Sequence, residues 1–466
     1  MGKFTKVFVL VVVAILLASF SASAAGEKEK AAPATPTVPA APAAQPAVKQ
    51  PIVVTFWHHE APAHRVAAFQ SVIDRFQAQH PNIKAKQEVI MWGDAWVKSL
   101  SSLQAGTLPD FQFSIPDLTL TMYKANALAP VTALFNELDA KYKFFPNLKG
   151  MYTYKGETWG IPVFTMVMLM TYRPSLLKQY VGTDQPPDTW EQALAYAKII
   201  TEKSKGDVAG IGIGGAKNLM TDEQAYIFLA GAGARFFDAK GNVTFNSPQT
   251  VAALKLYKDL FQYSPKGAEA WSWGEIELNI AAGSIAMSPY FPSVQKRFAE
   301  EFDSTDYAAA HMPLFKGMSK RGTITYPNEI HVFKKTTENA DRYEAVKTLI
   351  RFMEQPEINA ILTSGAEPGG FFPATEAAGA AKEYWDNPIV KKFDSIHRVA
   401  MSALKDYATL YGLEYDKWVN IGLGDITGAD ILGEVVNKVI SNQMTPEEAA
   451  AWGEKQMEKY SMPASE

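Results

Sequence analysis

The chain has 466 residues, no cysteine, ten tryptophans and a formal net charge of −4 at pH 7. The absence of cysteine excludes disulfide bonds, a cysteine nucleophile and a lipid-anchored cysteine. No basic run interleaved with aromatic residues is present, so we expect no nucleic-acid partner.

The first 25 residues have the pattern of a secretory signal peptide. Lys3 and Lys6 precede an apolar run over residues 7–17, and the small residues at 22–24 follow. No later apolar run reaches the roughly twenty residues that a membrane span needs. We expect an exported protein in the periplasm or on the extracellular side of the membrane, and the sequence leaves open whether the signal is cleaved or kept as an anchor. Residues 26–51, rich in Ala and Pro, predict a disordered linker.

The segment after the linker begins with alternating strands and helices. IVVTFW at 52–57 predicts a strand buried in a parallel sheet, and residues 64–79 place apolar side chains on one helical stripe. IKAKQEVI at 83–90 predicts a second strand, a helix follows around 94–104, and FQFSI at 111–115 predicts a third strand. This order predicts an α/β fold with right-handed crossovers, and the length fits two large lobes.

Three later segments carry helix-start signals. Asp188, with Glu191 three residues on, predicts an N-cap and a capping box. Ser247 followed by proline predicts another helix start. Thr445, followed by proline and then Glu448, predicts a third, with a capping box. The second half of the chain is therefore expected to be more helical than the first.

The stretch FWHHE at 56–60 places two histidines and a carboxylate together and raises the question of a metal site. Three residues separate Glu60 from His64, whereas the zinc-protease signature has two. His59 and His64, five positions apart, would lie about 140° apart on a helix. We therefore predict no metal and no cofactor. The stretch ends a predicted strand, where ligands bind in open α/β sheets, and packing against the next helix is the alternative.

Other catalytic patterns are weak. GIGIGG at 210–215 lacks the spacing of a dinucleotide-binding loop and favours a glycine-rich strand edge. Neither a P-loop nor a G-x-S-x-G nucleophile elbow occurs. Glu275 and Glu277 could serve a glycosidase, but nothing in the sequence requires that chemistry.

Aromatic residues recur beside polar ones in the predicted loops. Trp92 precedes Asp94, and Trp271 and Trp273 precede Glu275. A sugar packs its C–H face on a ring and offers its hydroxyls to carboxylates and amides, so these pairs suit a carbohydrate. Core packing is the alternative for each ring.

The order of motifs resembles family 1 of the extracellular solute-binding proteins, the maltose- and oligosaccharide-binding proteins of ABC importers. The matching segments include VTFWH, VIDRFQAQHPNIKAK and LQAGTLPDFQFSIPD, and they span almost the whole chain after the linker. The most specific run is residues 152–190, with Y-x-G-x-x-x-G-I-P and then P-P-x-T-W. Where the family usually has Tyr-Asn, this chain has Tyr172-Arg173.

The resemblance implies the periplasmic-binding-protein-like bilobal fold, two α/β lobes joined by a hinge with three chain crossings. The order of segments assigns residues 52–166 and 312–356 to the N-terminal lobe, and residues 167–311 and 357–466 to the C-terminal lobe. The crossings are expected near 164–168, 310–313 and 355–359. A ligand between the lobes would draw them together.

The resemblance also implies a set of ligand-binding residues from both lobes. They are Trp57, His58, Glu60, Trp92, Asp94, Asp117, Asp222, Trp271, Trp273, Tyr290, Phe371 and Trp418.

The function that follows is that of a monomeric receptor, not an enzyme. It would capture a carbohydrate and deliver it to the membrane permease of an ABC importer. Two alternatives stay open: a receptor for a polyamine or a metal complex, and a carbohydrate-active enzyme. The sequence does not identify the sugar, its chain length or its linkage, and it does not separate transport from sensing.

Overall fold

A computed structural model describes residues 50–413 and 420–462. The predicted signal peptide (1–25), the linker up to residue 49 and Trp418 lie outside the described residues. The chain from Gln50 onward forms one compact unit. Within its described part, no helix has both the length and the apolar character needed to cross a bilayer.

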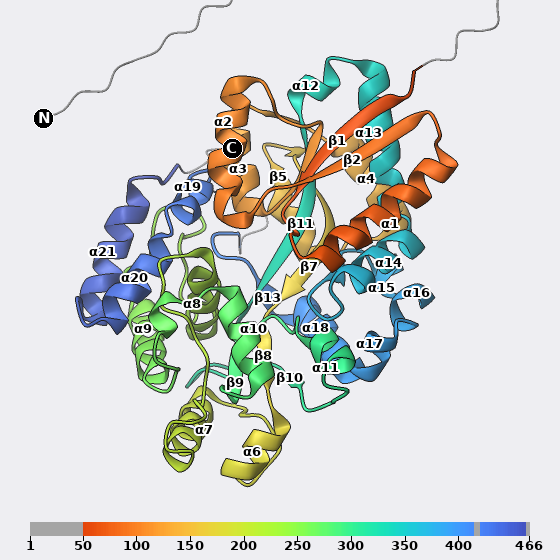
Figure 1. The fold of residues 1–466 in the computed structure, drawn as a ribbon. Helices are drawn as coiled ribbons and strands as arrows, with labels where there is room; N and C mark the ends of the chain where they lie inside the picture. Colours follow the sequence, from red (N-terminus) through yellow and green to blue (C-terminus); the bar gives the residue numbers. More distant parts are fainter. Residues whose placement is uncertain (1–49, 414–419, 463–466) are drawn as a thin grey trace, which may run out of the picture. The chain divides into compact units, whose positions relative to one another are not determined.

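A large mixed sheet forms the first structural layer, in the strand order β12-β7-β11-β3-β1-β2 (Figure 1). Strand β1 lies parallel to β2 and β3, which confirms the predicted strand–helix–strand start, whereas β11 runs antiparallel to β3 and β7. The strands are β1 (Ile52–His58), β2 (Ile83–Val89), β3 (Phe111–Ser114), β7 (Ile161–Val167), β11 (Thr323–Phe333) and β12 (Phe372–Pro373), with β4 (Leu128–Ala129) and β13 (Ala408–Thr409) paired to β11.

Helices and a small hairpin accompany this sheet. Helix α1 (Ala63–Gln79) buries Phe69, Val72, Ile73 and Phe76, most of the predicted apolar stripe. Together with the sheet we call these elements the large-sheet region. Besides the sheet and α1, the large-sheet region contains η1 (Trp92–Asp94), α2 (Ala95–Ala105), α3 (Pro116–Lys124), α4 (Thr132–Tyr142), α5 (Pro146–Lys149), η2 (Gly150–Tyr152), the hairpin of β5 (Thr153–Tyr154) and β6 (Glu157–Thr158), α12 (Lys334–Thr337), α13 (Ala340–Met353) and α14 (Pro356–Ala366).

A second sheet has the order β10-β8-β9. The chain passes from the large sheet to this one between β7 and β8, and returns between β10 and β11. We call this sheet and its helices the small-sheet region. Its elements are β8 (Leu169–Tyr172), β9 (Met287–Tyr290), β10 (Ala308–Ala310), α6 (Pro174–Tyr180), α7 (Trp190–Lys203), α8 (Leu219–Ala232), α9 (Pro248–Phe261), η3 (Ala268–Ala270), α10 (Trp273–Ala282) and α11 (Gln295–Glu300).

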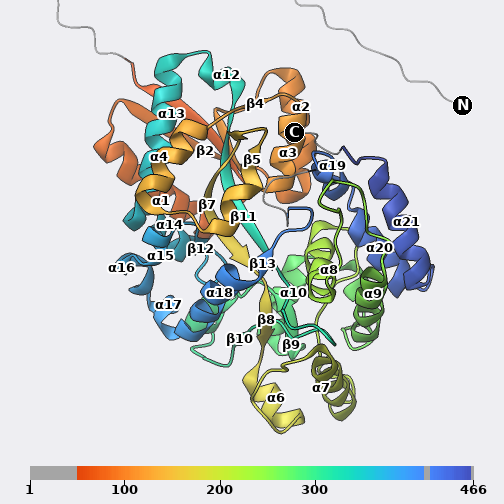
Figure 2. The same cartoon turned by 180° about the vertical axis from the view of Figure 1, so that it is seen from behind.

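The last part of the chain is mostly helical. Helices α15 and α16 pack on α14, and α17 and α18 follow them, whereas α20 packs against α8 and α9, and α21 against α9 (Figure 2). The bounds are α15 (Glu376–Gly379), α16 (Lys382–Trp385), α17 (Pro388–Lys392), α18 (Asp394–Asp406), α19 (Leu423–Gly428), α20 (Ile431–Ile440) and α21 (Pro446–Glu458). Helix α14 packs on α1. The predicted lobe boundaries stay a prediction, because the chain from Gln50 onward forms one unit.

Two of the predicted helix starts are confirmed and one is wrong. Ser247 caps α9, and Thr445 caps α21 in a capping box with its N3 glutamate. The cap of α7 is Thr189, not Asp188. The hydroxyl of Thr189 accepts the backbone N–H of Gln192. Because threonine is itself a good N-cap residue, the helix starts one residue later than predicted. The glycine-rich segment 210–215 forms no strand, although the N–H of Gly212 donates to a backbone oxygen at the edge of β9.

Candidate functional site

The two histidines at the end of β1 have different partners. His58 stacks on Phe69 of α1 with 4.4 Å between ring centroids, and its Nε2 lies 2.8 Å from Oε1 of Gln87. His59 stacks on Trp92, with 4.1 Å between centroids. Burial lowers the pKa of both imidazoles to about 4, so both are neutral at pH 7. Across the described residues, no group of three or more metal-ligating side chains could hold an ion.

Glu60, at the start of the loop after β1, binds Arg65 of α1. The Arg65 guanidinium donates to Glu60 at 2.8 Å and to Glu367 at 2.7 Å, and it lies 5.1 Å from the ring centroid of Phe371. Glu60 and Glu367 are 3% and 4% exposed. Burial raises the pKa of Glu60, and Arg65 opposes that shift. One partly buried cation, its side chain 19% exposed, therefore holds two buried carboxyl groups and faces an aromatic ring.

Glu277 of α10 brings a third carboxylate toward this cation. Its Oε1 accepts the hydroxyl of Ser293 at 2.7 Å and that of Tyr290 at 3.4 Å. Burial raises the pKa of Glu277; Glu367 raises it further and Arg65 lowers it. Glu277 thus lies within electrostatic reach of Arg65, although α10 belongs to the small-sheet region and α1 to the large-sheet region.

One hydrogen bond fixes the indole of Trp273, and a second fixes its main chain. Its Nε1–H donates to Glu223 of α8 at 2.8 Å, and its backbone oxygen accepts the Tyr290 hydroxyl at 3.1 Å. Glu223 is buried, and this burial raises its pKa to about 8. Trp273 itself is half-buried. A ring held in one orientation, with part of its surface open, is what stacking on a sugar requires.

Asp117 lies near the start of α3 and is fully buried. Its Oδ2 accepts the hydroxyls of Tyr326 at 2.6 Å and Tyr411 at 3.2 Å, whereas its Oδ1 has no hydrogen-bond partner. Burial raises the pKa of Asp117 to about 6, and the tyrosine hydrogen bonds oppose the shift. Besides burial, the largest cause, the negative charge of Asp117 contributes to the raised pKa of Glu223.

These contacts define what we call the carboxylate–aromatic site. Tyr290 connects its parts, because its hydroxyl lies 3.1 Å from the backbone oxygen of Trp273 and 3.4 Å from Oε1 of Glu277. The members are Glu60, Arg65, Asp117, Glu223, Trp273, Glu277, Tyr290, Glu367 and Phe371.

The other predicted residues are not members of the carboxylate–aromatic site. Asp222 accepts the backbone N–H of Gly433 at the start of α20, and Trp271, 8% exposed, lies before α10. Trp57 donates its indole N–H to Glu88 of β2 at 2.8 Å, which satisfies that group within the large-sheet region. Asp94 is exposed at the end of η1. Trp418 lies outside the described residues.

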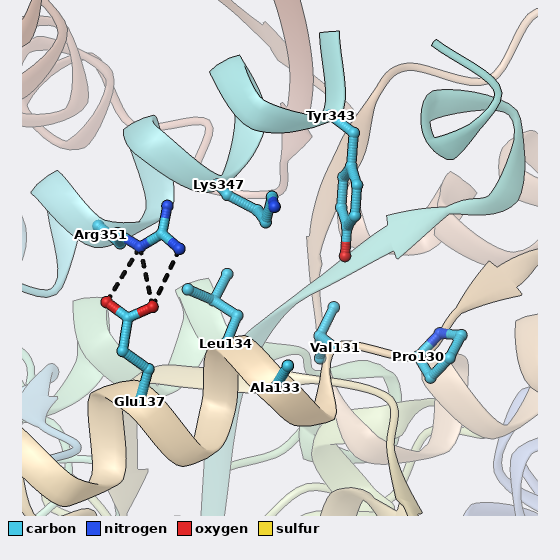
Figure 3. Close-up of a pocket in the computed structure, with 8 residues that line it drawn as sticks. All are labelled: Pro130, Val131, Ala133, Leu134, Glu137, Tyr343, Lys347 and Arg351. Atoms are coloured by element: carbon cyan, nitrogen blue, oxygen red, sulfur yellow. Dashed lines mark hydrogen bonds and ion pairs between the residues drawn. The ribbon is translucent and has the colours of Figure 1, made fainter. Parts of the chain in front are cut away.

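A hollow of about 190 Å³ lies elsewhere, between α4 and α13 (Figure 3). Arg351 binds Glu137 there through its Nε and Nη2 atoms, and Lys347 and Tyr343 lie beside them. No predicted site residue lines it, and its volume is below the roughly 300–1,000 Å³ typical of ligand pockets. We therefore do not assign the ligand to this hollow.

Sequence reasoning missed Arg65, Glu367 and the tyrosines that bind Asp117. Arg65 stands one residue after His64, and the spacing of the histidines, which is the signal in this segment, does not involve it. Glu367 is 302 residues distant along the chain, so no local pattern could connect the two. For Glu277, the sequence offered only a weak signal, the presence of a second carboxylate at Glu275.

The comparisons with known proteins define the class. The model of the bacterial extracellular solute-binding protein family matches residues 62–360, and the chain belongs to this family. YcjN of Escherichia coli (strain K12), which carries the name of an ABC transporter periplasmic-binding protein, is 24% identical over 396 residues, covering 84% of this chain and 88% of YcjN.

The solved structures show the same fold. Maltose-bound MalE3 of T. maritima has a TM-score of 0.74 at 19% identity, covering 88% of this chain and 99% of that one. A solute-binding protein of Thermotoga lettingae bound to α-D-tagatose has a TM-score of 0.72 at 20% identity, with the same coverage. The predicted fold, that of the bilobal periplasmic-binding proteins, is confirmed.

Proposed function

We propose that this chain is the substrate-binding receptor of an ABC importer for a sugar or oligosaccharide. The ligand binds at the carboxylate–aromatic site, draws the two regions together and is delivered to the membrane permease. Membership of the solute-binding family supports the receptor role. The solved relatives named above contain maltose and α-D-tagatose, which supports a carbohydrate as the ligand class.

The observation that carries the proposal is the orientation of Trp273. Its indole N–H donates to the buried carboxyl group of Glu223, so the ring cannot turn without breaking this partly buried hydrogen bond, and its backbone oxygen accepts the Tyr290 hydroxyl. Glu277 and Asp117 add carboxylate acceptors from the small-sheet and the large-sheet region. A flat ring with carboxylates around it matches the apolar face and the hydroxyl groups of a sugar.

We further propose that the two regions are the two lobes. The crossings from β7 to β8 and from β10 to β11 support the first two lobe boundaries. Because α14 packs on α1, the third crossing is proposed to follow α14 rather than precede it. Export by residues 1–25, a location in the periplasm or outside the membrane, a monomeric state and the lack of enzymatic activity belong to the same proposal.

The test is a thermal-shift screen of the chain from Gln50 onward against mono-, di- and oligosaccharides, with polyamines and divalent metals as controls. A ligand that binds only the folded state raises the melting temperature as its concentration exceeds its Kd. We expect a concentration-dependent shift with one family of sugars.

Two outcomes would contradict the proposal. Shifts with amines or metals alone would replace the sugar with another solute. Release of shorter products from a bound oligosaccharide would show an enzyme, and it should be examined by chromatography after long incubation at high protein concentration.

A further inference from the structure

Helix α19 is anchored in the small-sheet region. The Asn420 side chain donates to Ser461 at 2.8 Å and to the backbone oxygen of Gly241 at 3.2 Å, and it accepts the N–H of Met462 at 2.8 Å. Ser461 and Met462 follow α21, which packs on α9 and α20. The segment before α19 is therefore tied to helices that pack on α8 and α9 of the small-sheet region.

The body of α19 lies against α3 of the large-sheet region at a distance that only glycine permits. A methyl group built on Gly424 would overlap the backbone oxygen of Asp117 and the hydroxyl of Thr121. One built on Gly428 would lie 3.0 Å from Cδ1 of Trp96. Neither glycine has a positive φ. The requirement for glycine therefore comes from the close approach of the two helices and not from the backbone conformation.

The same surface carries a charge pair between the two regions. Lys124, at the end of α3, binds Asp425 of α19, with side chains 38% and 26% exposed. The contact also adjoins the carboxylate–aromatic site, because Gly424 meets the backbone of Asp117, whose carboxyl group binds Tyr326 and Tyr411.

We propose that α3 and α19 form a closing latch, a contact that breaks when the two regions separate and re-forms when they close. It rests on the proposed hinge motion of the receptor. Gly424 sets how closely the regions approach, and the Lys124–Asp425 pair favours the closed arrangement. Ligand affinity then depends on the latch, because a binding-competent state that is less populated lowers the apparent affinity by the same factor.

The test measures the distance between the regions without any ligand. The chain has no native cysteine, so Val97→Cys in α2, 74% exposed, and Asp259→Cys in α9, also exposed, take two fluorophores at known places. Single-molecule energy transfer is recorded for this protein and for the same protein carrying Gly424→Ala. The matched control is Gly365→Ala, because a methyl group at Gly365 in α14 has no heavy atom within 4 Å.

We expect a short-distance population in the parent protein that falls about tenfold with Gly424→Ala, in line with the cost of overpacking, and is unchanged with Gly365→Ala. An unchanged distribution in a folded Gly424→Ala protein, or a parent protein without the short-distance population, would overturn the latch. Since no sugar is used, failure of the sugar proposal leaves this result intact.

A charge swap provides a second test if Gly424→Ala does not fold. Lys124→Glu places two like charges opposite each other and should reduce the short-distance population. Adding Asp425→Lys to Lys124→Glu should restore it. Equal populations in all three proteins would also overturn the latch.

Discussion

Arg65→Ala removes the cation that holds the buried carboxylates together. In the wild-type protein the guanidinium donates to Glu60 at 2.8 Å and to Glu367 at 2.7 Å. Both carboxylates are at most 4% exposed, so neither can exchange its lost partner for bulk water without a local opening.

The magnitude follows from the burial of the pair. Removing one partner of a buried ion pair costs about 3–5 kcal/mol, because the remaining charge is left uncompensated. Part of this cost depends on pH. Burial already raises the pKa of Glu60, and loss of Arg65 raises it further. A carboxyl group whose pKa is raised in the folded state stabilises the fold at pH values below its unfolded-state pKa of about 4.5. That contribution is lost as the pH rises through the folded-state pKa. The deficit of Arg65→Ala should therefore be larger at pH 8 than at pH 5.

Urea unfolding at both pH values measures this deficit. The control is Arg398→Ala, which removes a surface pair with Asp394 whose side chains are 69% and 43% exposed. Such an exposed pair contributes little to stability, because solvent and salt screen it. If Arg65→Ala costs no more than Arg398→Ala at pH 8, or if its deficit grows as the pH falls, the electrostatic account of this cluster is wrong.

Two further predictions concern stability. Glu354 is fully buried, neither of its carboxyl oxygens has a partner, and burial holds its pKa well above the ordinary value, so the contribution of this residue to stability should fall as the pH rises from 5 to 8. Glu354→Gln should then raise the urea midpoint at pH 8 more than at pH 5, and equal effects at the two pH values would contradict this. Thr445→Ala removes the cap of α21 and should cost about 1 kcal/mol in urea unfolding, whereas no change would mean that this helix end does not contribute to global stability.

Local patterns predicted the first elements of the fold well. The β-branched run at 52–57 is buried in β1, and the stripe at 64–79 covers the sheet as α1, because burial and helical periodicity act over a few residues. The cap of α7 was missed by one residue, because Asp188 and Thr189 are both good cap residues and only the backbone geometry decides between them.

The site was harder to predict because its contacts are distant in sequence. Asp117 and Tyr290 were predicted, and their partners come from β11, α10 and the segment after β13. Trp57 was chosen for its indole beside a strand end, yet its N–H is bound to Glu88 in the neighbouring strand. Its contact with ligand stays a prediction, as do those of the other proposed residues.

The most direct test of the central claim is a calorimetric titration of three proteins with the sugar that gives the largest thermal shift. These are the wild type, Trp273→Ala and Trp452→Ala; Trp452 is also half-buried but lies in α21, where Lys438 covers its ring. By analogy with the stacking of bases on aromatic rings, loss of the Trp273 ring should weaken binding by about 1–3 kcal/mol, whereas Trp452→Ala should bind as the wild type does. Equal affinity of Trp273→Ala and wild type, or no measurable binding of any sugar to the wild type, would contradict the account.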